Sequence, residues 1–242
     1  MTLFSPYVTV PPVLAESLTR VRQRLHDACQ RCGRDPNAVT LVGVTKTIPV
    51  ERVRSAIALG LTDVGENRVQ EAQDKFPHLP AGVRRHLIGH LQRNKATHAV
   101  ELFDVIHSVD SAKLVEELER QRAARCPDAP PLEALVQVNV SGEATKFGCR
   151  PEDAASIANA VATSPHLRLA GLMTIAPLAD DPEAARPIFR SLRLLRDQLQ
   201  QTFPKPLRLS MGMSNDFEVA IEEGADLVRI GTAIFGERVT TP

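Results

Sequence analysis

Short apolar runs alternate with longer amphipathic stretches along nearly the whole chain. The run Thr40–Thr45 is rich in β-branched residues and too short for a helix, so it predicts a buried parallel strand. Seven further runs follow the same pattern, each separated from the next by a helical stretch. The eight predicted strands are Thr40–Thr45, Asp63–Gly65, His86–Gly89, Val105–Ser108, Leu135–Val140, Leu169–Met173, Arg208–Ser210 and Leu227–Ile230.

Amphipathic segments separate these strands, and one more precedes them. Val13–Arg31 repeats leucine and valine at helical spacing and ends just before Gly33. Asp181 followed by Pro182 is typical of a helix start, and Ser214 is predicted to cap the helix after the seventh strand. The other predicted helices are Val50–Leu59, Gln70–Lys75, Arg93–Val100, Ala112–Arg125, Glu152–Ala162, Pro182–Gln201 and Asp216–Glu223.

This order of elements predicts an α/β fold: a single (β/α)8 TIM barrel over residues 1–242, with an extra N-terminal helix able to occupy the eighth helical place. The alternative is an open doubly wound sheet, which usually has fewer strands and often carries a G-x-G-x-x-G loop after its first strand. Here the first strand is followed by Lys46-Thr-Ile-Pro49. Residues 1–12 are expected to form an extension ahead of the barrel.

Composition narrows the possible partners and the location. The chain has 242 residues with 29 basic and 29 acidic side chains, and this neutrality argues against nucleic acid, which requires a basic face. The longest run without a charged residue, Met1 to Ala15, is too short for a membrane span and has no basic targeting segment. A cytoplasmic protein that does not bind membranes is therefore expected.

The cysteines and histidines do not predict a metal site. Cys29 and Cys32 form a CxxC pair within a helical pattern, but no second pair accompanies them. His86 and His90 have ligand-like spacing, yet they lie at a predicted strand end, where positions four apart do not converge. We expect reduced thiols and no bound metal.

In a barrel of this kind the chemistry gathers at the carboxyl ends of the strands. The ends of strands seven and eight carry glycines and hydroxyl groups directly before helices. Backbone N–H groups and hydroxyls in such loops often hold a phosphate, although ordinary turn chemistry accounts for them almost as well. The residues concerned are Ser210, Gly212, Ser214, Gly231 and Thr232.

Lys46 ends the first strand, where burial would lower its pKa and let it attack a carbonyl group. A lysine that only reaches from the strand end to water is the simpler alternative. Together with a phosphate site, Lys46 is compatible with an aldolase acting on a phosphorylated sugar or with bound pyridoxal phosphate. Arg229, which ends strand eight, favours the second, because it could face the pyridine nitrogen and keep it unprotonated.

Seven segments of the chain closely resemble the pyridoxal phosphate homeostasis protein family, whose members are similar to the barrel domain of alanine racemase. They occur between residues 41 and 236 in the order and spacing of the family. The segments are Leu41-Val-Gly-Val-Thr-Lys46-Thr, Gly65-Glu-Asn-Arg-Val-Gln-Glu71, His86-Leu-Ile-Gly-His-Leu-Gln-Arg-Asn-Lys95, Ile106-His-Ser-Val-Asp110, Gly171-Leu-Met173, Leu209-Ser-Met-Gly-Met-Ser214 and Val228-Arg-Ile-Gly-Thr-Ala-Ile-Phe-Gly236.

The resemblance implies a role for individual positions. Lys46 would hold pyridoxal phosphate as a Schiff base, and Arg229 would face its pyridine nitrogen. Lys146 would be a secondary lysine that helps to pass the cofactor on. Ser210, Gly231 and Thr232 would anchor the phosphate, and Asn67, His86 and Met211 would line the ring pocket. Arg85 departs from the family, which often has tryptophan there, so packing at this rim would differ.

The implied function is a pyridoxal phosphate carrier that regulates vitamin B6, amino-acid and keto-acid pools without robust catalysis. The implied partners are pyridoxal phosphate and apo forms of enzymes that use it, with the chain a monomer or a homodimer. The alternatives are an amino-acid racemase and a Schiff-base aldolase. The sequence ends six residues after Gly236, so the second domain that supplies the racemase tyrosine is not expected, which disfavours the racemase.

Overall fold

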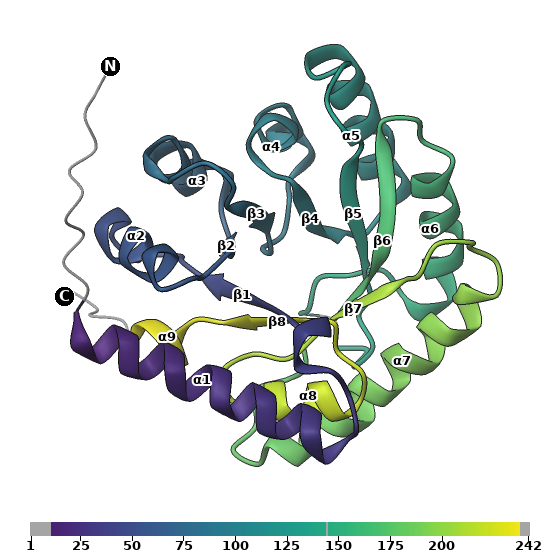
Figure 1. Ribbon diagram of the computed structural model, residues 1–242. Coiled ribbons are helices and arrows are strands. Elements are labelled where there is room, and N and C mark those ends of the chain that lie inside the picture. Colours follow the sequence, from purple (N-terminus) through teal and green to yellow (C-terminus); the bar gives the residue numbers. More distant parts are fainter. Residues whose placement is uncertain (1–10, 144, 238–242) are drawn as a thin grey trace.

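The computed structural model describes residues 11–143 and 145–237, within which eight parallel strands close into a barrel (Figure 1). The strands follow one another around the barrel in chain order, and β8 pairs with β1, which confirms the predicted topology. They are β1 Thr40–Val44, β2 Asp63–Glu66, β3 Arg84–Leu87, β4 Val105–Val109, β5 Leu132–Gln137, β6 Leu167–Met173, β7 Arg208–Ser210 and β8 Leu227–Ile230.

Helices cover the outside of the barrel, and the N-terminal helix takes the place next to β8 and β1. The helix after β8 is a single turn, and α1 lies along it and along α8 (Figure 1), so the predicted position of the leading helix is confirmed. The helices are α1 Pro12–Arg31, α2 Val50–Ala58, α3 Val69–Lys75, α4 Ala96–Leu102, α5 Ala112–Arg125, α6 Ala154–Ala162, α7 Arg186–Gln200, α8 Phe217–Glu222 and α9 Thr232–Phe235.

Three strands begin earlier along the chain than their apolar runs predicted. Strand β3 begins at Arg84 instead of His86, β5 at Leu132 instead of Leu135, and β6 at Leu167 instead of Leu169. The reason is a charged cluster at the amino-terminal mouth of the barrel, where the Glu133 carboxylate accepts hydrogen bonds or ion pairs from Arg84, Arg168 and Arg208. Strand residues that are neutralised in this way escape a search for apolar runs.

Helix starts agree with the sequence in one case and differ in another. The Asp181 side chain accepts a hydrogen bond from the Glu183 N–H at 2.9 Å, which confirms it as a cap, although the first turn, Pro182–Ala185, is a 3-10 helix. The prediction for Ser214 was wrong: α8 begins after Asp216, and Ser214 Oγ accepts from the Ala233 N–H at 3.3 Å.

The expected extension over residues 1–12 lies mostly outside the described residues, which start at Pro11, and Pro12 already belongs to α1. In the part of the chain that the structure describes, we find no helix with the length and apolar character needed to cross a bilayer.

Candidate functional site

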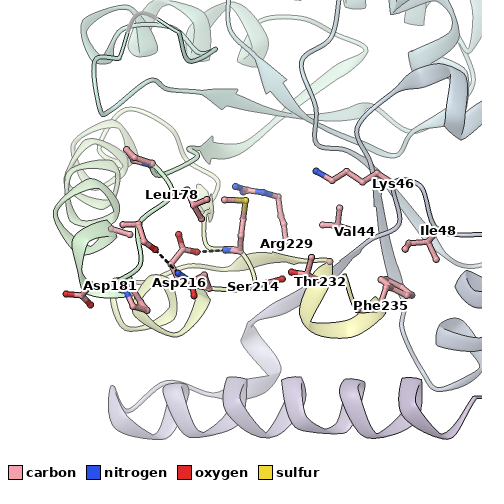
Figure 2. Close-up of a pocket in the computed structure, with 18 residues that line it drawn as sticks. Val44, Lys46, Ile48, Leu178, Asp181, Ser214, Asp216, Arg229, Thr232 and Phe235 are labelled. Atoms are coloured by element: carbon pink, nitrogen blue, oxygen red, sulfur yellow. Dashed lines mark hydrogen bonds between the residues drawn. The ribbon is translucent and has the colours of Figure 1, made fainter. Parts of the chain in front are cut away.

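A pocket of about 250 Å³ opens at the carboxyl ends of the strands, where the fold predicts chemistry (Figure 2). Strands β1 and β8 and the loops after β6 and β7 form its walls. Its lining includes Val44, Lys46, Ile48, Leu178, Asp181, Met213, Ser214, Asp216, Arg229, Gly231, Thr232 and Phe235. Five of the candidate residues from the sequence therefore meet at one place: Lys46, Ser214, Arg229, Gly231 and Thr232.

Lys46 and Arg229 provide the two basic groups of this pocket. In Figure 2 the Lys46 side chain extends from the end of β1 into the space that Arg229 borders from β8. Arg229 is 3% exposed, and its guanidinium donates to Ser210 Oγ at 2.6 Å and to the Thr174 carbonyl at 2.9 Å. Burial lowers the pKa of Arg229 to about 10. Arg229 is thus a rigidly held cation at neutral pH, able to donate hydrogen bonds but not to accept them.

The hydroxyl group that faces the pocket belongs to Ser214 instead of Ser210. Ser210 is fully buried behind Arg229, and its oxygen contacts both the Arg229 guanidinium and His107 Nδ1, the latter at 2.8 Å. These two contacts occupy the hydroxyl and leave it no donor for an anion in the pocket. Of these two serines, Ser214 is the one in the pocket lining, together with Gly231 and Thr232.

A chain of buried polar side chains continues from Ser210 through the barrel interior. His107 Nε2 lies 2.9 Å from His86 Nδ1, and His86 Nε2 lies 2.9 Å from Asp63 Oδ1. Burial lowers the pKa of His86, and burial with nearby positive charges lowers that of His107 well below its usual value, so both rings are neutral.

Neutral rings fix the direction of these hydrogen bonds. Despite its burial, hydrogen bonds from His86 and Thr62 lower the pKa of Asp63, so its carboxylate only accepts and the neutral His86 ring donates to it through Nε2. His86 Nδ1 then accepts from His107 Nε2–H, which leaves His107 Nδ1 to accept from the Ser210 hydroxyl while Arg229 donates to the same oxygen. His86 consequently supports Arg229 from within the barrel. It is not in the pocket lining, where the family resemblance had placed it.

Three other predicted residues lie apart from the pocket lining. Met211, directly after β7, is fully buried in the hydrophobic core. Asn67 is half-buried after β2, with its backbone packed beneath Gly89. Lys146 is exposed on the loop after β5, and its main chain is held by Glu143 and Asn139. The structure does not bring these side chains to the pocket.

Sequence reasoning missed two residues that shape the site. The carboxylate of Asp216 accepts from the Met213 N–H at 2.6 Å and thereby holds the loop after β7 against the pocket (Figure 2). His107 lies in the apolar run Val105–Val109, where a polar residue on a fully buried strand is a signal that could have identified it. Among the described residues, no cluster of three His, Cys, Asp or Glu side chains could hold a metal ion.

The family model described as alanine racemase, N-terminal domain, matches residues 17–239. A pyridoxal phosphate homeostasis protein of Aquifex aeolicus (strain VF5) is 45% identical over 225 residues, spanning 92% of this chain and 97% of that protein. The chain belongs to the pyridoxal phosphate homeostasis protein family.

Solved structures agree with this family assignment. PipY of Synechococcus elongatus PCC7942, a structure with PLP bound, is 36% identical with a TM-score of 0.78, and the match covers 92% of this chain and 100% of PipY. An alanine racemase of Clostridium difficile 630 has a TM-score of 0.74 at 14% identity, and the match covers 92% of this chain and 58% of the racemase. The racemase shares the barrel fold, and this likeness shows nothing more.

Proposed function

We propose that this chain binds pyridoxal phosphate (PLP) in the pocket through Lys46 and serves vitamin B6, amino-acid and keto-acid homeostasis without robust catalysis. The observation that carries the proposal is the convergence of Lys46, Arg229 and the loop around Thr232 on one pocket. The PLP-bound relative PipY, which shares this fold over its full length, supports the choice of ligand.

The donor groups of the pocket fit this cofactor. PLP supplies an aldehyde, which a lysine amine converts to a Schiff base with loss of water, and a phosphate that the protein must anchor. Lys46 would provide the amine, and the hydroxyls of Ser214 and Thr232 would donate to the phosphate. Only glycine fits easily at position 231, because an added Cβ would lie 3.3 Å from Val44 Cβ, and this lets the backbone approach a ligand closely.

Arg229 supports a role without robust catalysis. Enzymes that form carbanions on PLP depend on its ring as an electron sink, which is strongest when the pyridine nitrogen is protonated. Arg229 is buried and stays charged at neutral pH, and its guanidinium group can donate hydrogen bonds but cannot accept a proton. Placed opposite the ring nitrogen, it would keep that nitrogen unprotonated and weaken the sink.

The proposal extends to location and partners. We place the protein in the cytoplasm, where apo forms of PLP-dependent enzymes would receive the cofactor, and we assign Lys146 a secondary part in its release. The position of Lys146 on an exposed loop, outside the pocket lining, is compatible with contact to a recipient protein.

Reductive trapping tests the proposal directly. The protein is incubated with PLP, reduced with borohydride and digested, and the modified lysine is identified by mass spectrometry. We expect one phosphopyridoxyl group on Lys46 in the wild type and none in a folded Lys46→Ala variant. A stoichiometric adduct on Lys146 or Lys95 in that variant would overturn the assignment of Lys46.

A further inference from the structure

The residue after Lys46 has a backbone conformation that needs support. Thr47 has φ +64°, and among the described residues it is the only one other than glycine with a positive φ. A β-branched side chain disfavours this region strongly, so the surrounding structure must hold the turn in place. The turn sets the direction in which Lys46 leaves β1, which makes its support relevant to the pocket.

Both peptide groups that flank Lys46 are held by side chains from α3. The carbonyl of Thr45 accepts a hydrogen bond from Lys75 Nζ at 2.6 Å, and the N–H of Thr47 donates to Glu71 Oε1. Lys75 Nζ also contacts Glu71 Oε1 at 3.1 Å, an i,i+4 pair on one face of the helix. One lysine–glutamate pair thus fixes the chain immediately before and immediately after Lys46.

Glu66, at the end of β2, contacts Lys75 of this pair and the Thr45 side chain. Its Oε1 accepts from Lys75 Nζ at 2.5 Å and from the Thr45 hydroxyl at 2.6 Å. Glu66 is fully buried, Lys75 is 7% exposed, and Glu66 Oε2 has no hydrogen-bond partner among the described residues. Burial raises the pKa of Glu66, against the opposing effect of Lys75 and Thr45.

A buried ion pair with an unsatisfied oxygen is a poor means of stabilising a fold, because removing the charges from water costs much of what their attraction returns. Its geometry is better explained by what it holds. We propose that Glu66, Lys75 and Glu71 form a clamp that positions Lys46 for its reaction in the pocket. The three are positioning residues that act on the backbone of Lys46, and the functional meaning of the clamp rests on the proposed function.

The test compares variants of the full-length protein, beginning with Lys75→Met and Glu71→Ala. Lys113→Met and Glu116→Ala, at exposed positions of α5, are matched controls. If Lys75→Met fails to fold with Glu66 left unpaired, the double variant Lys75→Met with Glu66→Gln removes both charges together. Circular dichroism and thermal unfolding establish which variants are folded.

Two measurements need no cofactor: hydrogen exchange of the Thr47 amide, and the reactivity of Lys46 toward acetic anhydride relative to the exposed lysines. A third is the rate at which Lys46 is trapped by PLP and borohydride. We expect Thr47 exchange to rise and Lys46 trapping to slow by at least about tenfold in the clamp variants, since each loses a charge-assisted hydrogen bond. Glu71→Gln, which keeps an acceptor oxygen, should restore most of both values.

The outcomes separate the clamp from the proposed function. Folded clamp variants that trap PLP on Lys46 at the wild-type rate would overturn the positioning role even if Thr47 exchanges faster. If the wild type traps no PLP on Lys46, the proposed function fails, and the clamp is then judged by acetic anhydride: unchanged Lys46 reactivity in the variants overturns it, and altered reactivity supports it.

Discussion

Two serines in the segment after Leu209 lie four residues apart, and their different partners predict different effects of substitution. Ser214 lines the pocket, whereas Ser210 is engaged by Arg229 and His107. We expect Ser214→Ala to weaken PLP binding by about 1.5–3 kcal/mol, or at least about tenfold in Kd, because a donor to a charged phosphate is lost.

Equilibrium dialysis of the Ser214→Ala variant with PLP provides the measurement. The matched control is Ser191→Ala on α7, whose exposed hydroxyl donates to the Pro187 carbonyl at 2.8 Å. Equal PLP affinity in the wild type and the Ser214→Ala variant would remove Ser214 from the phosphate site.

Strands β2, β3, β4, β7 and β8 are joined inside the barrel by the chain of hydrogen bonds from Asp63 to Arg229. Its two histidines are neutral in the folded protein, since burial lowers both pKa values, and Arg84 and Arg208 act in the same direction. In the unfolded chain a histidine has a pKa of about 6.5 and takes up a proton below it. Lowering the pH through this range therefore favours unfolding.

We predict that stability falls as the pH drops from about 7 to 5, with each such histidine contributing up to about 1.4 kcal/mol per pH unit. His107→Gln removes one titrating group and keeps an amide donor and acceptor, so the slope should decrease by about that amount. Urea unfolding at several pH values measures it. His98→Gln, on α4, is the control, and an identical slope in wild type and His107→Gln would refute the assignment.

The amino-terminal ends of the strands carry a charged cluster, which we expect to contribute to stability. Glu133 is 4% exposed and is surrounded by Arg84, Arg168 and Arg208, which enter from β3, β6 and β7. Glu133→Gln leaves three guanidinium groups without their shared counter-charge. Because these arginines are partly exposed, we expect a loss of about 2 kcal/mol, below the full cost of breaking a buried pair.

Urea unfolding of the Glu133→Gln variant tests this value. Glu117→Gln, which breaks an exposed pair with Arg120, should cost much less than Glu133→Gln. The trapping of PLP on Lys46 should be unchanged in both folded variants, because the charged cluster lies at the amino-terminal mouth and the pocket at the carboxyl-terminal one.

For the molecule as a whole, the alternation of apolar runs and amphipathic stretches was enough to predict the closed barrel. It failed at Arg84 and Glu133, since charges that neutralise one another across a mouth look like loop residues in a linear sequence. The pocket was located from the strand ends, but Ser210 and Ser214 could not be ranked. Their roles depend on which hydroxyl Arg229 reaches on the neighbouring strand or its loop, and that is a property of three-dimensional packing.

The same limit applies to catalysis, which depends on what surrounds both faces of a bound substrate. Among the described residues that line the pocket, the ionisable ones are Lys46, Asp181, Asp216 and Arg229. Asp216 holds the Met213 N–H, Asp181 caps the helical turn at Glu183, and Arg229 cannot accept a proton. Lys46 is left as the one evident base, whereas racemisation uses an acid or base on each face.

We therefore predict that the PLP-loaded protein racemises L-alanine far more slowly than a racemase, since each missing acid–base group typically costs ~10²–10⁴ in rate. Proton NMR in heavy water, with chiral analysis of the amino acid, measures both exchange and racemisation. The PLP-treated Lys46→Ala variant gives the background rate. Turnover near ~10 s⁻¹, the ordinary enzyme median, would contradict the carrier proposal and favour a racemase. A racemisation rate close to background is expected, because one base can remove the α-proton but cannot deliver a proton to the opposite face. Exchange is expected to be slow as well, because a ring nitrogen kept unprotonated by Arg229 makes the cofactor a weak electron sink.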